Sequence, residues 1–151
     1  MTDLIEVKTA DLVGEALGWA VGKAEGLDVY LEPPGYNGVP WRVFVRYQGQ
    51  AIEHTKRYNP WEDWALAGPL IDKHKVSLSP PASAVHRNFG YMDKRNGYYE
   101  SGFWSSTIYG KERKHRRTVF HHLDNPLTVA MQAIVQLELG DTVQVPKELM
   151  P

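Results

Sequence analysis

The chain has 151 residues, 42% of them hydrophobic, and its formal net charge of −1 gives no support for a nucleic-acid or membrane partner. The length fits one domain, residues 1–151, and the absence of cysteine excludes disulfides and cysteine-based zinc sites. The opening residues do not form a signal peptide and no segment reaches the ~18 apolar residues of a membrane span, so we expect a cytoplasmic protein.

The first predicted elements are a short strand at Ile5–Val7 and a helix from Ala10 to Ala24. Thr9 is placed as the N-cap of this helix, and Gly26 as the residue that ends it. Apolar residues recur along the helix at helical spacing. They are Val13, Ala16, Leu17, Ala20, Val21 and Ala24.

A β-hairpin is predicted next. A strand at Asp28–Leu31 is followed by a loop rich in proline and glycine, residues 33–40, and by a clear strand at Trp41–Tyr47. Alternation along Trp41–Tyr47 places Arg42, Phe44 and Arg46 on one face and Trp41, Val43, Val45 and Tyr47 on the other. The turn at residues 48–50 leads into a partner strand at Ala51–His54, which makes the pairing antiparallel.

A short helix is predicted after this hairpin. Asn59 is placed as its N-cap and Pro60 at its first position, and Gly68-Pro69 is expected to break or bend it. A further strand is expected at Val76–Leu78.

The last part of the chain contains a second long helix. Asp124 or Asn125 caps this helix, Pro126 takes its first position and Gly140 ends it, before a strand at Thr142–Val145. Residues 82–123 show less regularity, with one or two strands within Tyr98–Ile108 and a hairpin turn at Asn96-Gly97. The order of elements predicts an α+β fold in which an antiparallel or mixed β-sheet packs with two main helices and one short broken helix.

Three segments resemble the NinX-like proteins of tailed bacteriophages. They are Val7-Lys8-Thr9 through Lys23-Ala24-Glu25-Gly26, then Tyr58-Asn59-Pro60 through Gly68-Pro69-Leu70-Ile71, and finally Pro126-Leu127 through Val145-Pro146 and Glu148-Leu149. The resemblance implies a small phage accessory protein acting in the cytoplasm of the infected host. It implies no activity and transfers no catalytic residue. Residues 82–123 do not share it and are interpreted as a variable, insertion-like region.

The most unusual segment lies around the predicted short helix. Tyr58 and Trp61 are candidates to stack a base, with Asn59 or Asp63 bonding to its edge. The alternative is that Trp64 packs in the core while Asn59 and Asp63 only cap the helix.

Cationic candidates lie in two further places. Arg42 and Arg46, with Phe44 between them, suit a ligand with two phosphates, unless this is simply a solvated sheet face. The basic run from Lys111 to Arg117 contributes Arg113 and Arg116 as phosphate ligands, with a solvated loop as the alternative. His121 can face an anion at the start of the last helix; the alternative is that one of His121 and His122 is simply packed and the other exposed. Trp104 completes the ligand-binding set.

No catalytic, phosphate-loop or metal-binding motif is present in the sequence, so we expect neither an enzyme nor a cofactor. By analogy with small phage proteins that sequester nucleotide signals of bacterial defence, we expect a homo-oligomer that binds a cyclic nucleotide or an ADP-ribose derivative. The alternatives are a protein-interaction module that inhibits a host factor and a phosphodiesterase-like enzyme acting on the same ligands.

Overall fold

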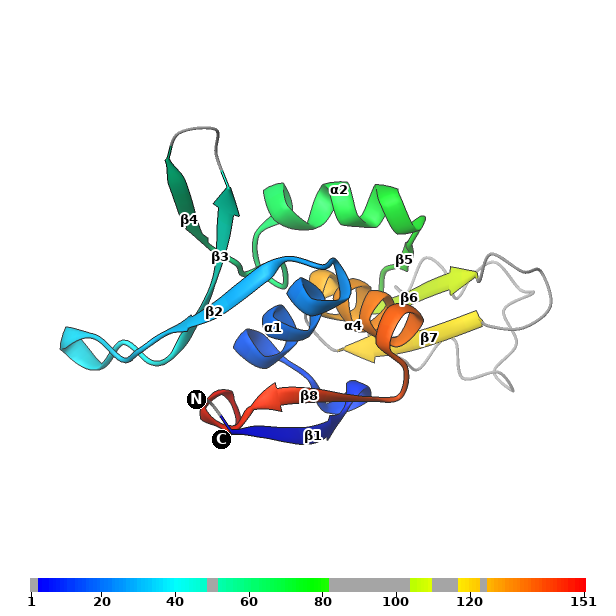
Figure 1. Ribbon diagram of the computed structural model, residues 1–151. Coiled ribbons are helices and arrows are strands. Elements are labelled where there is room, and N and C mark those ends of the chain that lie inside the picture. Colours follow the sequence, from blue (N-terminus) through cyan, green and yellow to red (C-terminus); the bar gives the residue numbers. More distant parts are fainter. Residues whose placement is uncertain (1–2, 49–51, 82–103, 110–116, 123–124) are drawn as a thin grey trace, which may run out of the picture.

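Two helices, α1 (Gly14–Ala24) and α4 (Pro126–Leu139), pack against each other at the centre of the protein (Figure 1). The structure is a computed structural model that describes residues 3–48, 52–81, 104–109, 117–122 and 125–151. A third helix, α2 (Trp64–His74), lies against α4. Short 3₁₀ turns occur at Thr9–Asp11, Tyr36–Gly38 and Lys147–Leu149.

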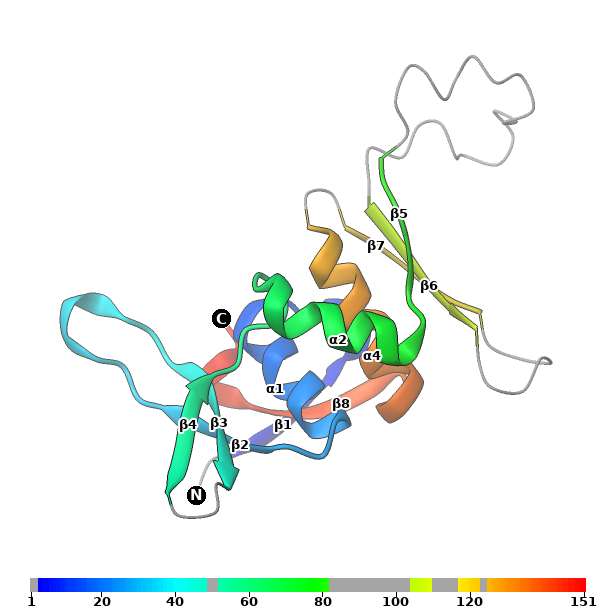
Figure 2. The ribbon, with the colours of Figure 1, turned by 90° about the horizontal axis from the view of Figure 1, so that it is seen from above.

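Three small sheets surround these helices. The first pairs β1 (Leu4–Lys8) with β8 (Thr142–Pro146). The second contains β2 (Asp28–Glu32), β3 (Arg42–Gln48) and β4 (Glu53–Arg57), and the third contains β5 (Ser77–Ser79), β6 (Trp104–Tyr109) and β7 (Arg117–His122). Every pairing between the described strands is antiparallel, so the α+β class is confirmed. Figure 2 shows the second and third sheets at opposite ends of the molecule.

Helix α4 forms the centre of the core. All nine residues from Leu127 to Val135 are buried, because α1, α2 and the strands β6 and β7 cover the helix on several sides. Its buried Gln132 is satisfied by donating from Nε2 to the Leu12 carbonyl oxygen, 2.9 Å away. Ser106 on β6 donates to the Val129 carbonyl oxygen at 2.6 Å and so ties the third sheet to the same helix.

The predicted start of the first helix is wrong. Helix α1 begins at Gly14, whose left-handed φ of 57° separates it from the preceding 3₁₀ turn. Thr9 does not cap it, because the Thr9 hydroxyl donates instead to the Gly140 carbonyl oxygen at 2.6 Å. The predicted end is confirmed, with Gly26 in the left-handed region at φ 71°.

The predicted start of the middle helix is also wrong. Asp63, not Asn59, caps α2, and its Oδ1 accepts a hydrogen bond from the Ala65 N–H at 2.9 Å. Gly68-Pro69 was expected to break or bend the helix, and it does not break it, since α2 continues through Pro69 to His74. Pro69 removes the hydrogen bond to the Ala65 carbonyl, but both residues are exposed, so water can satisfy that oxygen.

The remaining predicted elements agree with the structure within one or two residues wherever it describes them, except that the strand predicted at Ala51–His54 is β4, which ends three residues later at Arg57. The strand expected within Tyr98–Ile108 corresponds to β6, whereas the Asn96-Gly97 turn lies outside the described residues. Residues 82–123 are described only at β6 and β7, so their insertion-like character stays a prediction. In the described part of the chain, no helix combines the length and apolar character needed to cross a membrane.

Candidate functional site

The strands β2 and β3 present a face directed away from the core. Val29, Val43 and Val45 fill the opposite face and are buried. Residues directly opposite in an antiparallel pair share a face, and the register pairs Tyr30 with Phe44. It also pairs Asp28 with Arg46 and Glu32 with Arg42 on the same outer face.

Two aromatic rings lie at the middle of this face. The ring centroids of Tyr30 and Phe44 are 6.0 Å apart, and the ring planes are tilted by 39°. Both side chains are half-buried, so the rings are held by neighbours while part of each surface meets solvent. Such a pair offers apolar ring surface against which a planar ligand can pack.

An arginine flanks each ring. The Arg46 Cζ lies 4.0 Å from the Tyr30 ring centroid, and the Arg42 Cζ lies 5.4 Å from the Phe44 ring centroid. We call Tyr30, Arg42, Phe44 and Arg46 together the arginine–aromatic face. It combines stacking surfaces with two guanidinium groups, as expected for Arg42, Phe44 and Arg46 from the alternation along β3.

The two arginines have different partners. Arg46 Nη1 forms an ion pair with Asp28 Oδ1 at 3.4 Å. Arg42 forms no ion pair with any described residue, although Glu32 lies opposite it in the register. Its Nε is buried and has no hydrogen-bond partner among the described residues.

Helix α1 holds the sheet that carries this face. Glu15 Oε2 accepts a hydrogen bond from the Val43 N–H at 2.8 Å, and the same carboxylate contacts the Arg57 guanidinium. Arg57 also lies 3.8 Å from Glu62 Oε1. The beginning of β3 and the end of β4 are therefore both anchored to α1, which limits movement of the arginine–aromatic face.

The prediction that Tyr58 and Trp61 stack a ligand is wrong, because both rings belong to the core. Tyr58 is buried and Trp61 is only 9% exposed, so neither offers a free ring face to a ligand. The alternative interpretation was also wrong about Trp64, which is 58% exposed. Of these two tryptophans, it is Trp61 that packs inside.

Asn59 and Asp63 make structural hydrogen bonds. The Asn59 carbonyl accepts from the N–H groups of Glu62 and Asp63, both at 3.1 Å, and its Nδ2 donates to Glu62 Oε1 at 2.9 Å. The Asp63 carboxylate caps α2. These contacts fit the capping interpretation, although Asp63 rather than Asn59 is the cap.

The other candidates do not join the arginine–aromatic face. Trp104 lies on β6 and His121 on β7, in the sheet at the opposite end of the molecule (Figures 1 and 2). Arg113 and Arg116 lie outside the described residues. Their roles in phosphate binding stay predictions, separate from the site on β2 and β3.

A comparison with protein families shows which family the chain belongs to. A family model described as bacteriophage P22 NinX matches residues 8–137. The chain belongs to the NinX family of phage proteins. The resemblance expected from the three sequence segments is thus confirmed, and the match includes all of β2 and β3. A search of curated proteins finds no match.

Tyr30 is the member of the site in this NinX chain that sequence reasoning missed. It lies between Asp28 and Glu32 on a strand whose alternation alone does not say which face is buried. The signal was the pairing with the next strand, because Val29 falls opposite the buried Val45. Once that register is known, Tyr30 must share the outer face with Phe44.

A second polar cluster in the NinX chain connects helix ends. Glu25, which follows α1, accepts hydrogen bonds from Lys73 Nζ and His74 Nε2 at the end of α2, both at 2.5 Å. His74 Nδ1 lies 3.8 Å from Glu138 Oε1 on α4. Burial raises the pKa of the Glu25 carboxyl, but the hydrogen bonds from Lys73 and His74 outweigh it and bring that pKa below its ordinary value. With side-chain exposures of 6% for Glu25 and 7% for His74, this cluster joins three helices.

In the described part of the chain, no three or more histidine, aspartate or glutamate side chains gather in a way that could hold a metal ion.

Burial, and to a smaller extent the charge of Glu25, raises the pKa of the Tyr58 phenol well above its ordinary value. Tyr58 therefore stays neutral at physiological pH, in keeping with a core residue.

Proposed function

We propose that this NinX-family protein binds and sequesters a small anionic ligand of nucleotide type at the arginine–aromatic face. The observation that carries the proposal is the Tyr30–Phe44 ring pair with Arg42 and Arg46 above it. Rings stack the planar part of such a ligand and guanidinium groups bind its phosphate. Cyclic nucleotides and ADP-ribose derivatives in the host cytoplasm are the leading candidates.

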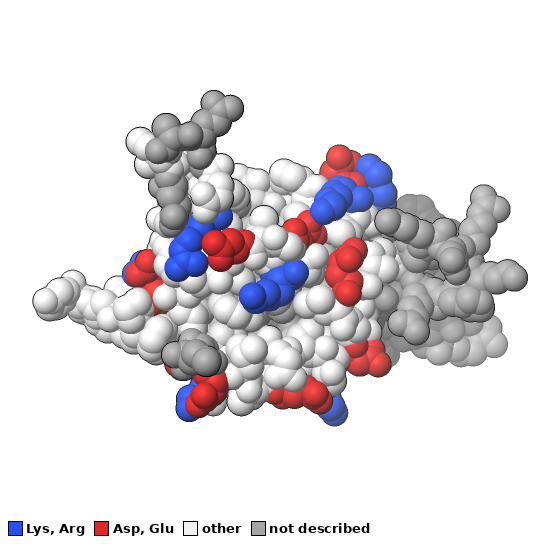
Figure 3. All heavy atoms as spheres, in the orientation of Figure 1, with Lys and Arg blue, Asp and Glu red and all other residues white. Residues whose placement is uncertain are grey.

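The charge distribution favours a small ligand over a nucleic acid. On the face shown in Figure 3, Lys and Arg side chains are interspersed with Asp and Glu, among the residues that are coloured. Long polyanions bind to continuous positive surfaces, and this protein has a net charge of −1. A single arginine pair on one sheet face suits a compact anion better.

The test is thermal stability against a panel of cyclic dinucleotides, ADP-ribose isomers and ordinary nucleotides, followed by calorimetry on any ligand that stabilises. A ligand at 100 times its dissociation constant should stabilise the fold by about 2.7 kcal/mol. Phe44→Ala should abolish that shift. Lys56→Ala is the matched control, because Lys56 is an exposed cation opposite Val45 on the other face of the same sheet.

The state of the ligand after release separates storage from catalysis. A sequestering protein returns the ligand intact after heat denaturation, whereas a phosphodiesterase-like enzyme returns product. Light scattering tests the proposed homo-oligomer. A panel without any stabilising ligand would overturn the proposal.

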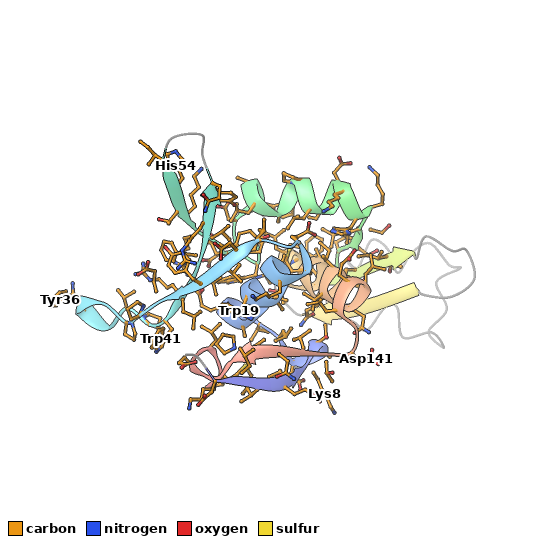
Figure 4. All side chains as sticks on the ribbon, in the orientation of Figure 1. Lys8, Trp19, Tyr36, Trp41, His54 and Asp141 are labelled. Atoms are coloured by element: carbon orange, nitrogen blue, oxygen red, sulfur yellow. The ribbon has the colours of Figure 1, made fainter. Side chains whose placement is uncertain are left out.

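One structural feature supports the alternative of a protein-interaction module. The loop between β2 and β3, residues 33–41, projects from the body and contains no charged residue (Figures 1, 3 and 4). Tyr36 at its tip is 95% exposed. A hydrogen bond from Gly35 N–H to the Val39 carbonyl, at 3.1 Å, holds the loop's shape. If this loop binds a host protein, Tyr36→Ala should weaken that interaction and leave nucleotide binding unchanged.

A further inference from the structure

We infer that the two arginines of the arginine–aromatic face have different tasks: Arg42 binds the phosphate of the ligand, and Arg46 with Tyr30 stacks its planar ring. This division rests on the proposed function and narrows it. The ligand class becomes a nucleoside with one phosphate group at the Arg42 end, not a bisphosphate held by both arginines.

The first argument is the charge around each guanidinium. Asp28 Oδ1 lies 3.4 Å from Arg46 Nη1, so a phosphate bound to Arg46 would be placed beside a carboxylate that repels it. Glu32 lies opposite Arg42 in the register, but neither Glu32 nor any other described carboxylate comes within ion-pair distance of the Arg42 guanidinium. An incoming anion therefore gains more binding free energy at Arg42 than at Arg46.

The second argument is the hydrogen-bonding capacity of Arg42. Its Nε is covered by protein atoms and has no acceptor among the described residues. The group that remains for a ligand is the terminal pair of nitrogens, which bind a phosphate by two parallel N–H donations. Arg42 is thus covered at its Nε and binds a phosphate end-on through its terminal nitrogens.

The third argument is the stacking geometry at the other end. The Arg46 Cζ lies 4.0 Å from the Tyr30 centroid, which is the distance of direct stacking, whereas Arg42 lies farther from Phe44 at 5.4 Å. A guanidinium held against an aromatic ring extends the surface that a ligand can contact, and bases stack on arginine planes as they do on aromatic rings. Arg46 and Arg42 are four residues apart on one strand, about 13 Å between Cα atoms. Both lean toward the central rings, so the two ends are closer than this and a single nucleotide can contact both.

The experiment compares ligands with and without a phosphate group, on wild type and on variants, using calorimetry on the full chain. The probes are AMP against adenosine and GMP against guanosine, and the variants are Arg42→Gln, Arg46→Gln and the control Lys56→Gln. Wild type should bind each monophosphate about tenfold or more tightly than its nucleoside, equivalent to about 1.4 kcal/mol. In Arg42→Gln this ratio should fall to near one while nucleoside affinity is unchanged.

The same comparison of ligands and variants should give the opposite pattern for Arg46, which contacts the planar ring of the ligand. Arg46→Gln should weaken nucleoside and monophosphate by the same factor and keep their ratio. Adenosine 3′,5′-bisphosphate should bind no more than about threefold more tightly than AMP. Urea denaturation of each variant confirms that folding is intact, and Lys56→Gln should match wild type.

The outcomes distinguish an error in the roles of Arg42 and Arg46 from an error in the proposed nucleotide site. If the phosphate preference disappears in Arg46→Gln instead, or the bisphosphate binds tenfold more tightly than AMP, the division of tasks is wrong while the nucleotide site stands. If wild type binds none of these probes and no member of the wider panel, both the proposed function and this inference are overturned.

Discussion

Gly18 on α1 lies directly against the ring of Trp61. A Cβ atom added at Gly18 would lie 2.5 Å from Trp61 Cζ3 and 2.9 Å from the Tyr58 carbonyl oxygen. Neither distance is tolerated by real side chains, and one of the two atoms belongs to the backbone. Gly18 therefore permits the close approach that buries Trp61 against α1.

Gly18→Ala should destabilise the protein by about 1–3 kcal/mol, because the added methyl overpacks this contact. Urea denaturation measures the loss, with the m-value expected to stay unchanged. Gly68→Ala is the control, since a Cβ there meets nothing within 4 Å beyond its chain neighbours. A loss under about 0.5 kcal/mol for Gly18→Ala would show that the ring moves freely.

Trp61 and Trp64 should respond very differently to truncation. Trp61→Ala leaves a large cavity in the core and should cost about 3–5 kcal/mol of unfolding free energy. Trp64 is mostly exposed, so Trp64→Ala should stay within about 0.5 kcal/mol of wild type. Thermal and urea denaturation of both variants provide the measurement. A mild effect at Trp61 would return it to the candidates for ligand contact.

Asn125 has two separable roles at the start of α4. Its Oδ1 accepts from the N–H groups of Leu127 and Thr128, at 3.0 and 3.2 Å, and its Nδ2 donates to the Trp61 carbonyl oxygen at 3.0 Å. Asn125→Ala loses both and should cost about 0.5–2 kcal/mol from the cap alone. Asn125→Asp keeps the acceptor and loses only the donor, so its urea midpoint should lie between those of wild type and Asn125→Ala. Equal midpoints for Asp and Ala would mean that the bond to Trp61 dominates.

Glu25 should make stability fall in acid. Its pKa is lowered in the folded state, so its contribution is fully present above the unfolded pKa of about 4.3 and is lost as pH falls through the lower folded value. Urea denaturation should show Glu25→Gln less stable than wild type at pH 7, with the difference constant above about pH 5 and shrinking below about pH 4. Asp72→Asn is the control for burial: the hydrogen bond from Lys75 also lowers the pKa of the Asp72 carboxyl, but this pair lies on the open surface, where solvent screening should leave a much smaller difference. A difference that persists unchanged to pH 3 would contradict the charge-based account.

Local signals in the sequence predicted the parts of the fold that depend on neighbouring residues. Asn125 followed by Pro126 marked the start of α4 correctly, since capping needs only adjacent groups. Alternation along β3 placed Arg42, Phe44 and Arg46 on one face, which the structure confirms. Three of the four residues of the arginine–aromatic face were therefore predicted from the sequence.

The features that the sequence could not predict depend on contacts between residues far apart in the chain. The start of α1 depends on Thr9, whose hydroxyl bonds to Gly140 at the other end of the chain. The burial of Trp61 rather than Trp64 depends on the space left by Gly18. Tyr30 joined the site only through the β2–β3 register. None of these partners lies within a few residues of the position it controls.

The pairing of β1 with β8 sets the timing of folding during synthesis. Lys8 pairs with Thr142, so the first strand leaves the ribosome long before its partner exists. At ~5–20 residues per second, translation of the intervening residues takes about 7–27 s. Throughout that interval α1 also lacks α4, the helix it packs against in the core. The nascent chain must therefore keep β1 and the apolar side of α1 from other partners until α4 and β8 have been made.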